Sequence, residues 1–179
     1  MIITLAGKPG SGKSVVADIL AKKLNFKRYS AGNFRREMAK KRGLSLAEFN
    51  KLGEKEDFTD KDADKWQVKI GKTKNNFIID GRLSYHFIPN SIKIFLDVSP
   101  EVGANRIMLS KRDEEKMTNK KEALKLWKER CNSDMKRYEK YYKINPYKKE
   151  QFDFVLDTSH LTVEETARKI LEYLNSTRK

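Results

Sequence analysis

The sequence predicts an α/β fold, with helices on both faces of a five-stranded, mostly parallel sheet. Two features carry this prediction. Short apolar runs rich in β-branched residues alternate along the chain with longer segments whose apolar residues recur at helical spacing. The runs 77–80 and 92–98 are apolar without alternation, which is typical of strands that a parallel sheet buries on both faces. Because helices join neighbouring parallel strands, this order indicates a three-layer α/β/α domain.

The first elements flank a glycine-rich loop. Residues 1–6 read as a short buried strand. The segment 14–24 carries apolar residues at helical spacing and predicts a helix, and 26–29 predicts the second strand.

Residues 33–72 are expected to form a helical excursion from the sheet. Its first helix covers 33–42, with Gly32 or Asn33 near the cap and Gly43 at the end. The pattern from Ser45 to Glu48 is a capping box that opens a short helix to about residue 53. A third helix is expected from about residue 60 to 70.

The second half of the chain returns to the sheet. Ser99-Pro100 supplies an N-cap and a proline at the first helical position, so a helix is expected over 99–109. A long helix covers 120–142 and ends before Pro146. The last strand is expected at 152–156, and a capping box from Thr162 to Glu165 opens the final helix.

Length and cysteine content bound the class of protein. A chain of 179 residues is the size of one domain. Its single cysteine, Cys131, cannot form an intramolecular disulfide and favours a reducing compartment. No stretch approaches the roughly 20 apolar residues of a membrane span, and no signal peptide is visible. We therefore expect a cytoplasmic protein without a membrane partner.

The charge balance is strongly basic. Lys and Arg number 39 against 25 Asp and Glu, a formal net charge of +14. An excess of this size fits an anionic partner, either a nucleic acid or a phosphorylated small molecule. The lysines nevertheless fall in short runs such as 120–121 and 148–149, which favours a solvated surface. No motif that combines aromatic and basic residues indicates a specific nucleic acid.

The segment from Gly7 to Ser14 fits the pattern G-x-x-x-x-G-K-[ST] between a strand and a helix. Glycines let backbone N–H groups turn inward around a phosphate, and the N-terminal end of the following helix attracts the same anion. Lys13 is expected to reach the β- and γ-phosphates of a nucleoside triphosphate, and the Ser14 hydroxyl to bind Mg²⁺. The sequence therefore predicts a phosphate-binding loop.

A second motif, Asp80-Gly81-Arg82, ends the apolar run 77–80. An aspartate at this place beside a phosphate loop is the usual second anchor of a nucleotide-bound Mg²⁺, directly or through water. Gly81 lets the backbone pass close to a ligand, and Arg82 can clamp a phosphate. The alternative interpretation is an ordinary Asp-Gly turn.

Two further groups of arginines are candidates for an acceptor site. Arg35 and Arg36 follow Ser30 at the start of a predicted helix, where a ligand anion would offset an unfavourable helix dipole; a solvated cation is the alternative. Arg130, Asp134 and Arg137 are spaced i, i+4, i+7 and share one helix face. They form either a surface ion-pair ladder or a polar clamp for the edge of a base.

Taken together, these motifs resemble the cytidylate kinases, particularly the archaeal type. The resemblance covers nearly the whole chain. It is carried by 7–14, Ser30-Ala31-Gly32 with Arg36, 79–82, 93–97, Arg106, the group Arg130, Asp134 and Arg137, and 155–159.

The resemblance implies a P-loop nucleoside monophosphate kinase that transfers the γ-phosphoryl group of MgATP to CMP or dCMP. The family fold implies a core at 1–32, 73–107 and 120–179, a monophosphate-binding excursion at about 33–72 and a lid at about 108–119. We expect a monomer whose partners are these small nucleotides.

Site residues carry over by position. The residues expected to hold ATP are Gly7, Lys8, Pro9, Gly10, Ser11, Gly12, Lys13, Ser14 and Val15. Those expected to hold CMP are Ser30, Arg36, Gly81, Arg82, Arg130, Asp134 and Arg137. The expected catalytic residues are Lys13, Arg82 and Arg106, and the metal anchors are Ser14 and, through water, Asp80. Arg112 is a further lid candidate, while Asp57, Asp60, Asp64 and Gln67 lie in the excursion without an assigned role.

Two alternatives remain open at the level of sequence. A kinase for another small acceptor, similar to adenylate or shikimate kinases, would keep the loop but give Asp134 little part in selectivity. A nucleic-acid-binding NTPase would use the net charge of +14 and bind with a steep salt dependence.

Overall fold

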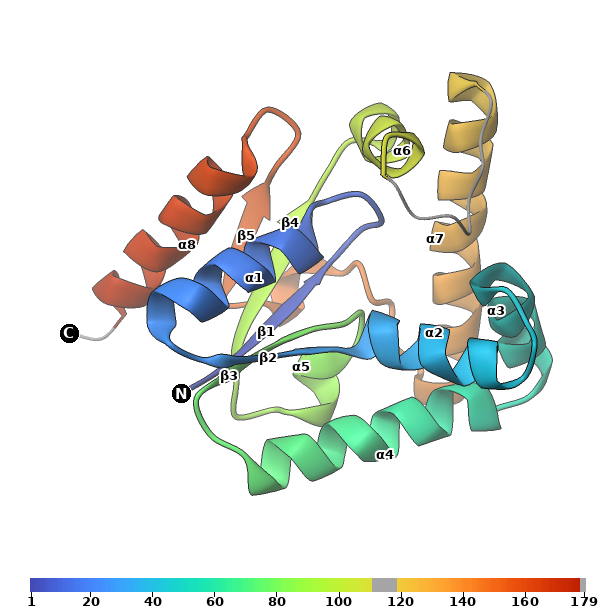
Figure 1. Ribbon diagram of the computed structural model, residues 1–179, viewed down its shortest axis with the longest axis horizontal. Helices are drawn as coiled ribbons and strands as arrows, with labels where there is room; N and C mark the ends of the chain where they lie inside the picture. The colour runs from blue at the N-terminus through green and yellow to red at the C-terminus, as the bar shows by residue number, and fades with distance from the viewer. Residues whose placement is uncertain (111–118, 178–179) are drawn as a thin grey trace.

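Five strands form one sheet in the order β2-β3-β1-β4-β5 in the computed structural model, which describes residues 1–110 and 119–177 (Figure 1). All four pairings are parallel. The prediction of a five-stranded, mostly parallel sheet is therefore confirmed, and the sheet of the described residues is parallel throughout. The strands are β1 Ile2–Gly7, β2 Lys27–Ser30, β3 Phe77–Asp80, β4 Ile92–Asp97 and β5 Phe154–Asp157.

Helices cover both faces of this sheet (Figure 1). They are α1 Lys13–Leu24, α2 Ala31–Lys41, α3 Leu46–Lys55, α4 Phe58–Thr73, α5 Ser84–Phe87, α6 Pro100–Met108, α7 Lys120–Tyr142 and α8 Val163–Ser176, with a 3₁₀ turn at Lys149–Gln151.

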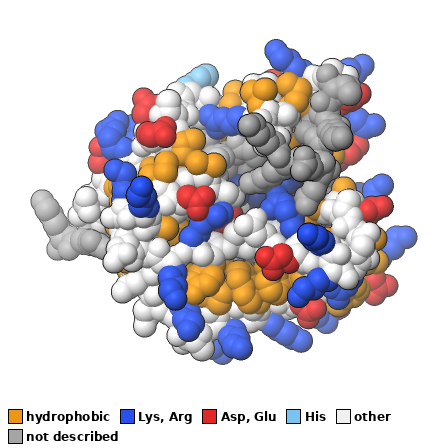
Figure 2. All heavy atoms as spheres, in the orientation of Figure 1, with side chains coloured by type: hydrophobic (Ala, Val, Ile, Leu, Met, Phe, Trp, Pro, Cys, Tyr) orange, Lys and Arg blue, Asp and Glu red, His pale blue; other side chains and the backbone are white. Residues whose placement is uncertain are grey.

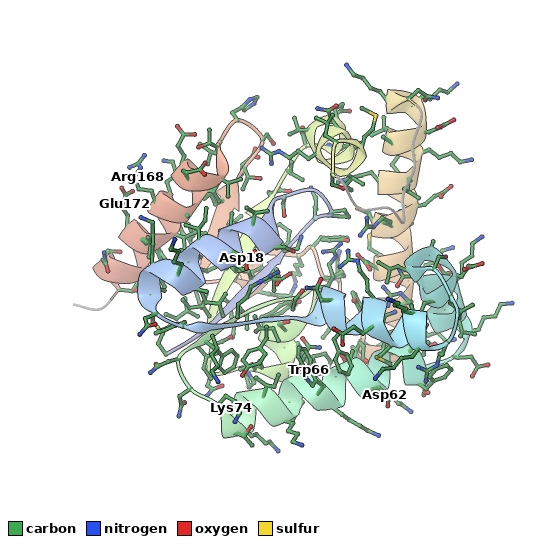
Figure 3. The ribbon with its side chains drawn as sticks, in the orientation of Figure 1. Asp18, Asp62, Trp66, Lys74, Arg168 and Glu172 are labelled. Carbon is green, nitrogen blue, oxygen red and sulfur yellow. The ribbon has the colours of Figure 1, made fainter. Side chains whose placement is uncertain are left out.

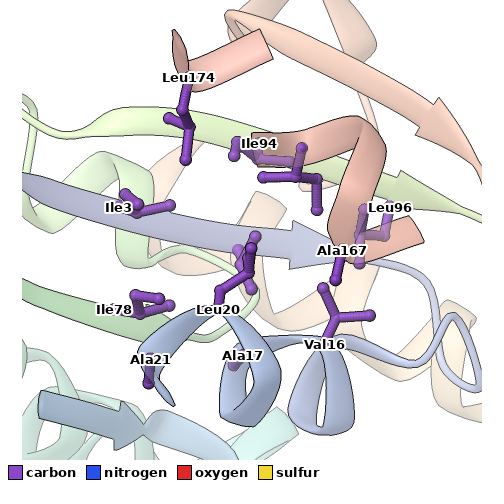
Figure 4. Close-up of a cluster of buried hydrophobic side chains, with 12 residues drawn as sticks. Ile3, Val16, Ala17, Leu20, Ala21, Ile78, Ile94, Leu96, Ala167 and Leu174 are labelled. Carbon is purple, nitrogen blue, oxygen red and sulfur yellow. The ribbon is translucent and has the colours of Figure 1, made fainter. Parts of the chain in front are cut away.

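The two faces of the sheet divide the core. Ile3 and Leu5 of β1 belong to a cluster on one face with Leu20 of α1 and Ile170 of α8. Figure 4 shows Ile3 and Leu20 within this cluster. Ala6 and Phe95 belong to a cluster on the opposite face with Leu83, Tyr85 and Tyr138. This alternation follows from the pleat of the strand, and it leaves β1 buried throughout.

The excursion at residues 31–73 has a small core of its own. Met38 and Ala39 of α2 pack with Phe49 of α3, and Phe58 at the start of α4 lies against them. The three helices therefore form a packed unit that lies beside α7 (Figure 1).

Several boundaries differ from the sequence prediction for local reasons. The helix expected to begin at Asn33 begins at Ala31, because the Ser30 hydroxyl caps it by accepting from the Asn33 N–H. Arg35 and Arg36 consequently lie beyond its first turn, so the dipole argument for them was wrong. The helix α5 was missed because it has only four residues.

Candidate active site

Four polar or loop residues lie at one edge of the sheet. β1 ends at Gly7, β2 at Ser30, β3 at Asp80 and β4 at Asp97. Since these pairings are parallel, the carboxyl ends share an edge, which is where ligands bind in open α/β sheets.

Backbone geometry explains two of the loop glycines. Gly7 has a φ of 140° and Gly10 a φ of 74°, conformations that L-residues rarely adopt. A Cβ atom on Gly10 would also lie 2.2 Å from the backbone oxygen of Gly103 in α6. The phosphate loop therefore packs directly against the backbone of α6.

The Lys13 side chain is folded into the loop and buried. Burial lowers its pKa well below the ordinary value, and the positive charge of Arg82 acts in the same direction, whereas Asp80 opposes it. An anion beside this ammonium would stabilise its charged form, which suits the role expected toward phosphate. Its three acceptors are Gly7 O at 2.9 Å, Lys8 O at 2.7 Å and Ser11 Oγ at 3.2 Å.

Asp80 joins the phosphate loop to the start of α2. Its Oδ2 accepts from Ser14 Oγ and from Ser30 Oγ, both at 3.1 Å. Its Oδ1 accepts from Arg28 of β2 at 3.0 Å, a contact that nothing in the sequence indicates. A hydroxyl and a carboxylate in contact are oxygen donors of the kind that Mg²⁺ prefers, so this pair fits the expected metal.

The loop is braced by residues that sequence reasoning missed. The Trp127 indole of α7 donates to Pro9 O at 2.9 Å. Thr158, just after β5, donates from Oγ1 to Ser11 O at 3.2 Å and to Asp97 O at 2.9 Å. The contacts with Pro9 and Ser11 span more than a hundred residues of chain and the contact with Asp97 spans 61, so no local pattern could reveal them.

Lys8 pairs with a protein carboxylate. Its ammonium lies 2.8 Å from Asp97 Oδ1, and Lys149 lies 2.6 Å from Asp97 Oδ2. Burial opposes ionisation of Asp97, but the hydrogen bonds from Lys149 and Lys8 outweigh it and hold the pKa below its ordinary value. The structure thus gives Lys8 a partner at the end of β4, while Val15 of the same loop is 52% exposed.

Three of the predicted acceptor residues, Arg82, Asp134 and Arg137, meet at the Asp134 carboxylate. Its Oδ2 accepts from Arg82 Nε at 2.6 Å and from the Tyr147 hydroxyl at 2.9 Å, and its Oδ1 accepts from Arg137 at 2.7 Å. Burial opposes its ionisation, yet the charges of Arg82 and Arg137 lower its pKa to about 2. The structure therefore brings Arg82, Asp134 and Arg137 together.

A buried extension of this cluster reaches the excursion. Asp60 of α4 accepts from Arg137 and from Arg35, each at 2.7 Å. Arg137 is 1% exposed and Asp60 3% exposed, so Arg137 does not lie on an open helix face. The interpretation of the α7 residues as a surface ion-pair ladder was therefore wrong. Arg35 also donates to Asn50 of α3 at 3.1 Å and so ties the three excursion helices together.

The remaining predicted arginines occupy three places. Arg36 on α2 donates to Asn33 Oδ1 at 3.1 Å, and Arg130 lies half-buried one turn before Asp134 on α7. Arg106 of α6 lies at the turn after β5, where it donates to Thr158 O at 2.7 Å and to Leu161 O at 3.2 Å. Arg112 lies outside the described residues, as do all residues from 111 to 118 of the predicted lid at about 108–119.

Comparison with known proteins agrees with this geometry. The model of the cytidylate kinase-like family matches residues 2–160. The cytidylate kinase of Sulfurisphaera tokodaii is 39% identical over 98% of this chain and 96% of its own length. The cytidylate kinase of Methanocaldococcus jannaschii is 39% identical over 92% of both chains.

A solved structure supports the fold. Shikimate kinase from Bacteroides thetaiotaomicron covers 98% of both chains with a TM-score of 0.66 and 17% sequence identity. This likeness concerns the P-loop kinase fold alone, whereas the sequence relatives above share much more of the chain's residues. The protein belongs to the cytidylate kinase-like family.

Proposed function

We propose that the protein transfers the γ-phosphoryl group of ATP to CMP or dCMP, giving ADP and CDP or dCDP. The observation that carries the proposal is the shared carboxylate at Asp80. Ser14 of the phosphate loop and Ser30 at the start of the excursion both bind it, so a donor side and an acceptor side meet there. In this proposal the cluster of Arg82, Asp134 and Arg137, whose side chains meet at the Asp134 carboxylate, belongs to the acceptor side.

Phosphoryl transfer requires positioned reactants and compensation of negative charge more than a strong base. In the proposed reaction Lys13, Arg82 and Arg106 supply positive charge to the transferring group. The acceptor phosphate is already nucleophilic, so no general base is required. Mg²⁺, when bound at Ser14 and Asp80, would neutralise charge on the donor phosphates.

The division into core, excursion and lid remains part of this proposal. The packed unit formed by α2, α3 and α4 supports an excursion that binds the acceptor monophosphate at about 33–72. In it Ser30, Arg36, Gly81 and Arg130 complete the acceptor site, and the residues 7–15 hold ATP.

Other properties of the protein stay predictions. Among the helices in the described part of the chain, none has the length and apolar character needed to cross a membrane. A cytoplasmic location, a monomeric state and the absence of a specific nucleic acid partner accompany the proposed function.

A coupled assay tests the proposal directly. The purified protein is given MgATP with CMP, dCMP, UMP or AMP, and ADP formation is followed. We expect the highest kcat/KM with CMP or dCMP, and loss of turnover by at least about 10³-fold in Lys13→Met. A preference for AMP, or equal rates with all four acceptors, would contradict the proposal. ADP formation from MgATP with shikimate, and with none of the four nucleotides, would instead identify a kinase similar to shikimate kinases.

A further inference from the structure

One face of α4 lies against α5, the segment at Gly81 and α7. Asp60, Asp64 and Gln67 are spaced i, i+4, i+7 and therefore share that face. Gln67 Oε1 accepts from Ser84 Oγ of α5 at 2.6 Å, and a Cβ atom on Gly81 would lie 3.4 Å from the same oxygen. With Arg137 bound to Asp60, this face borders the proposed acceptor site.

The residues first expected to recognise the base are already engaged by protein groups. Asp134 accepts three hydrogen bonds, and Arg137 donates to two carboxylates. On the α4 face, Asp60 and Gln67 are each 3% exposed, whereas Asp64 is partly exposed. Asp64 is therefore the carboxyl group of this face that a ligand can approach.

Two neighbours orient the Asp64 carboxyl group. Oδ2 accepts from the Tyr142 hydroxyl of α7, and Oδ1 accepts from Gln67 Nε2 at 3.3 Å. A carboxyl oxygen has two lone-pair sites, so each oxygen retains capacity for one more hydrogen bond. The geometry leaves a fixed pair of oxygens that can meet the edge of a base.

Resting on the proposed function, we propose that Asp64 recognises the acceptor cytosine as a neutral carboxylic acid. Cytosine presents an acceptor at N3 beside a donor at its N4 amine. The acid O–H of Oδ1 donates to N3, and Oδ2 accepts from N4. Uracil presents the opposite pattern, N3–H beside the O4 acceptor, and would require the acid proton on Oδ2. Because Oδ2 already accepts from the Tyr142 hydroxyl, whereas Oδ1 has only the longer contact with Gln67, the proton stays on Oδ1 and the acid disfavours UMP.

The surroundings of Asp64 favour the neutral form. The pKa of the Asp64 carboxyl group is raised to about 7 overall. Burial is the largest cause of this rise; the Tyr142 hydrogen bond lowers the pKa, and the negative charge of Asp60 raises it. The positive charges of Arg35 on α2 and Arg137 on α7 lower it by smaller amounts.

One other titratable ring, the His86 imidazole, lies near this site. The His86 ring of α5 lies 6.2 Å from the Tyr142 ring, and burial lowers the pKa of that imidazole. A test of Asp64 must therefore include a variant of His86.

The test compares kcat/KM for CMP with that for UMP between about pH 6 and about pH 8.5. Both acceptors carry the same phosphate, so its ionisation cancels in the ratio. We expect the wild-type ratio to fall about tenfold over this range as the acid ionises. Asp64→Asn keeps a donor and an acceptor without titrating, so its ratio stays high and flat. Asp64→Ala lowers the ratio about tenfold at the acidic end.

Two control variants define the outcome. Asp62, exposed on the same helix (Figure 3), is changed to Asn and should keep the wild-type profile. Three outcomes would overturn the inference. The first is a ratio of kcat/KM for CMP to UMP in Asp64→Ala that equals the wild-type ratio. The others are a wild-type pH dependence of this ratio in Asp64→Asn, or a ratio that does not change with pH in His86→Gln.

Calorimetry with CMP and UMP separates this inference from the proposed function. If the enzyme were inactive toward CMP, the proposed function would be refuted. The role of Asp64 would still be supported if the protein bound CMP more strongly than UMP and Asp64→Ala lost this preference. Equal binding of both nucleotides to the wild type would overturn it.

Discussion

At the scale of single residues, the proposed acceptor side is built on buried charge. Arg35, Asp60, Arg137, Asp134 and Arg82 alternate in sign along a chain of contacts of 2.6 to 2.7 Å. Burying charges costs free energy that only their mutual pairing offsets, so removing one member leaves its partners uncompensated. These residues therefore determine stability as well as the geometry of the proposed acceptor site.

Asp134→Ala should destabilise the protein by about 3–5 kcal/mol, because it leaves Arg82 and Arg137 without their shared carboxylate. Urea unfolding measures this change, with the exposed Asp62→Ala as a control. A loss below about 1 kcal/mol would contradict the interpretation. Any loss of CMP selectivity in this variant must be separated from loss of fold.

The same carboxylate predicts a pH dependence of stability. Its pKa is lowered to about 2 in the folded protein, mainly by Arg82 and Arg137 against the effect of burial. Its contribution is therefore complete above an unfolded pKa of about 4 and is lost as the pH falls toward 2. Thermal melting of wild type and Asp134→Asn from about pH 6 to about pH 2.5 should show this loss in the wild type alone; parallel curves would contradict it.

At the scale of elements, α6 and α7 hold the phosphate loop from outside the sheet. Trp127 donates to Pro9 O, and a Cβ atom on Gly103 would lie 2.5 Å from the Trp127 indole nitrogen. The loop, α6 and α7 therefore form one tightly packed corner, which couples the donor site to the helix that also carries Asp134.

Trp127→Phe should keep most of this packing and remove one hydrogen bond. We expect a stability loss of about 1 kcal/mol and a rise of about fivefold in KM for ATP, with KM for CMP unchanged. Steady-state kinetics with each nucleotide varied in turn measures this. Trp66→Phe, at a tryptophan of α4 that stacks on Phe34 (Figure 3), is the matched control. Equal changes in both KM values would contradict a local role.

The elements show how far sequence could predict this structure. Strands β1, β3 and β4 are mostly apolar, β-branched runs, and the phosphate loop is a contiguous motif, so both are visible locally. Helical spacing places Arg130, Asp134 and Arg137 on one face of α7. The burial of Arg137, however, depends on its contact with Asp60, more than seventy residues away in the chain. Arg28 contacts Asp80 across 52 residues of chain and Trp127 contacts Pro9 across 118, while Tyr147 reaches Asp134 only because the chain turns back after α7. No periodicity encodes these contacts.

At the scale of the whole molecule, the net charge of +14 spreads over the surface. Figure 2 shows Lys and Arg side chains around the visible face, interspersed with Asp and Glu. Pairs such as Arg168 and Glu172 on α8 (Figure 3) are exposed and contribute little to stability. Repulsion among the excess cations therefore acts on the folded protein as a whole.

Salt should stabilise the protein by screening this repulsion. Raising NaCl from about 20 mM to about 300 mM should increase Tm by a few degrees, because surface charges are screened and buried pairs are not. Differential scanning calorimetry at each salt concentration measures this, with an uncharged solute at matched osmolality as control. A Tm that falls with salt would show that attractive surface pairs dominate.

The central position of β1 has a consequence for synthesis on the ribosome. Ile3 pairs with Ile78 on one side and with Ile92 on the other, so the first strand to emerge has its partners 75 or more residues later. At about 5–20 residues per second this segment waits about 4–15 s before the sheet can form around it. Throughout that interval an apolar strand is available to chaperones, and changes in the rate of translation upstream of β3 should alter the yield of folded protein.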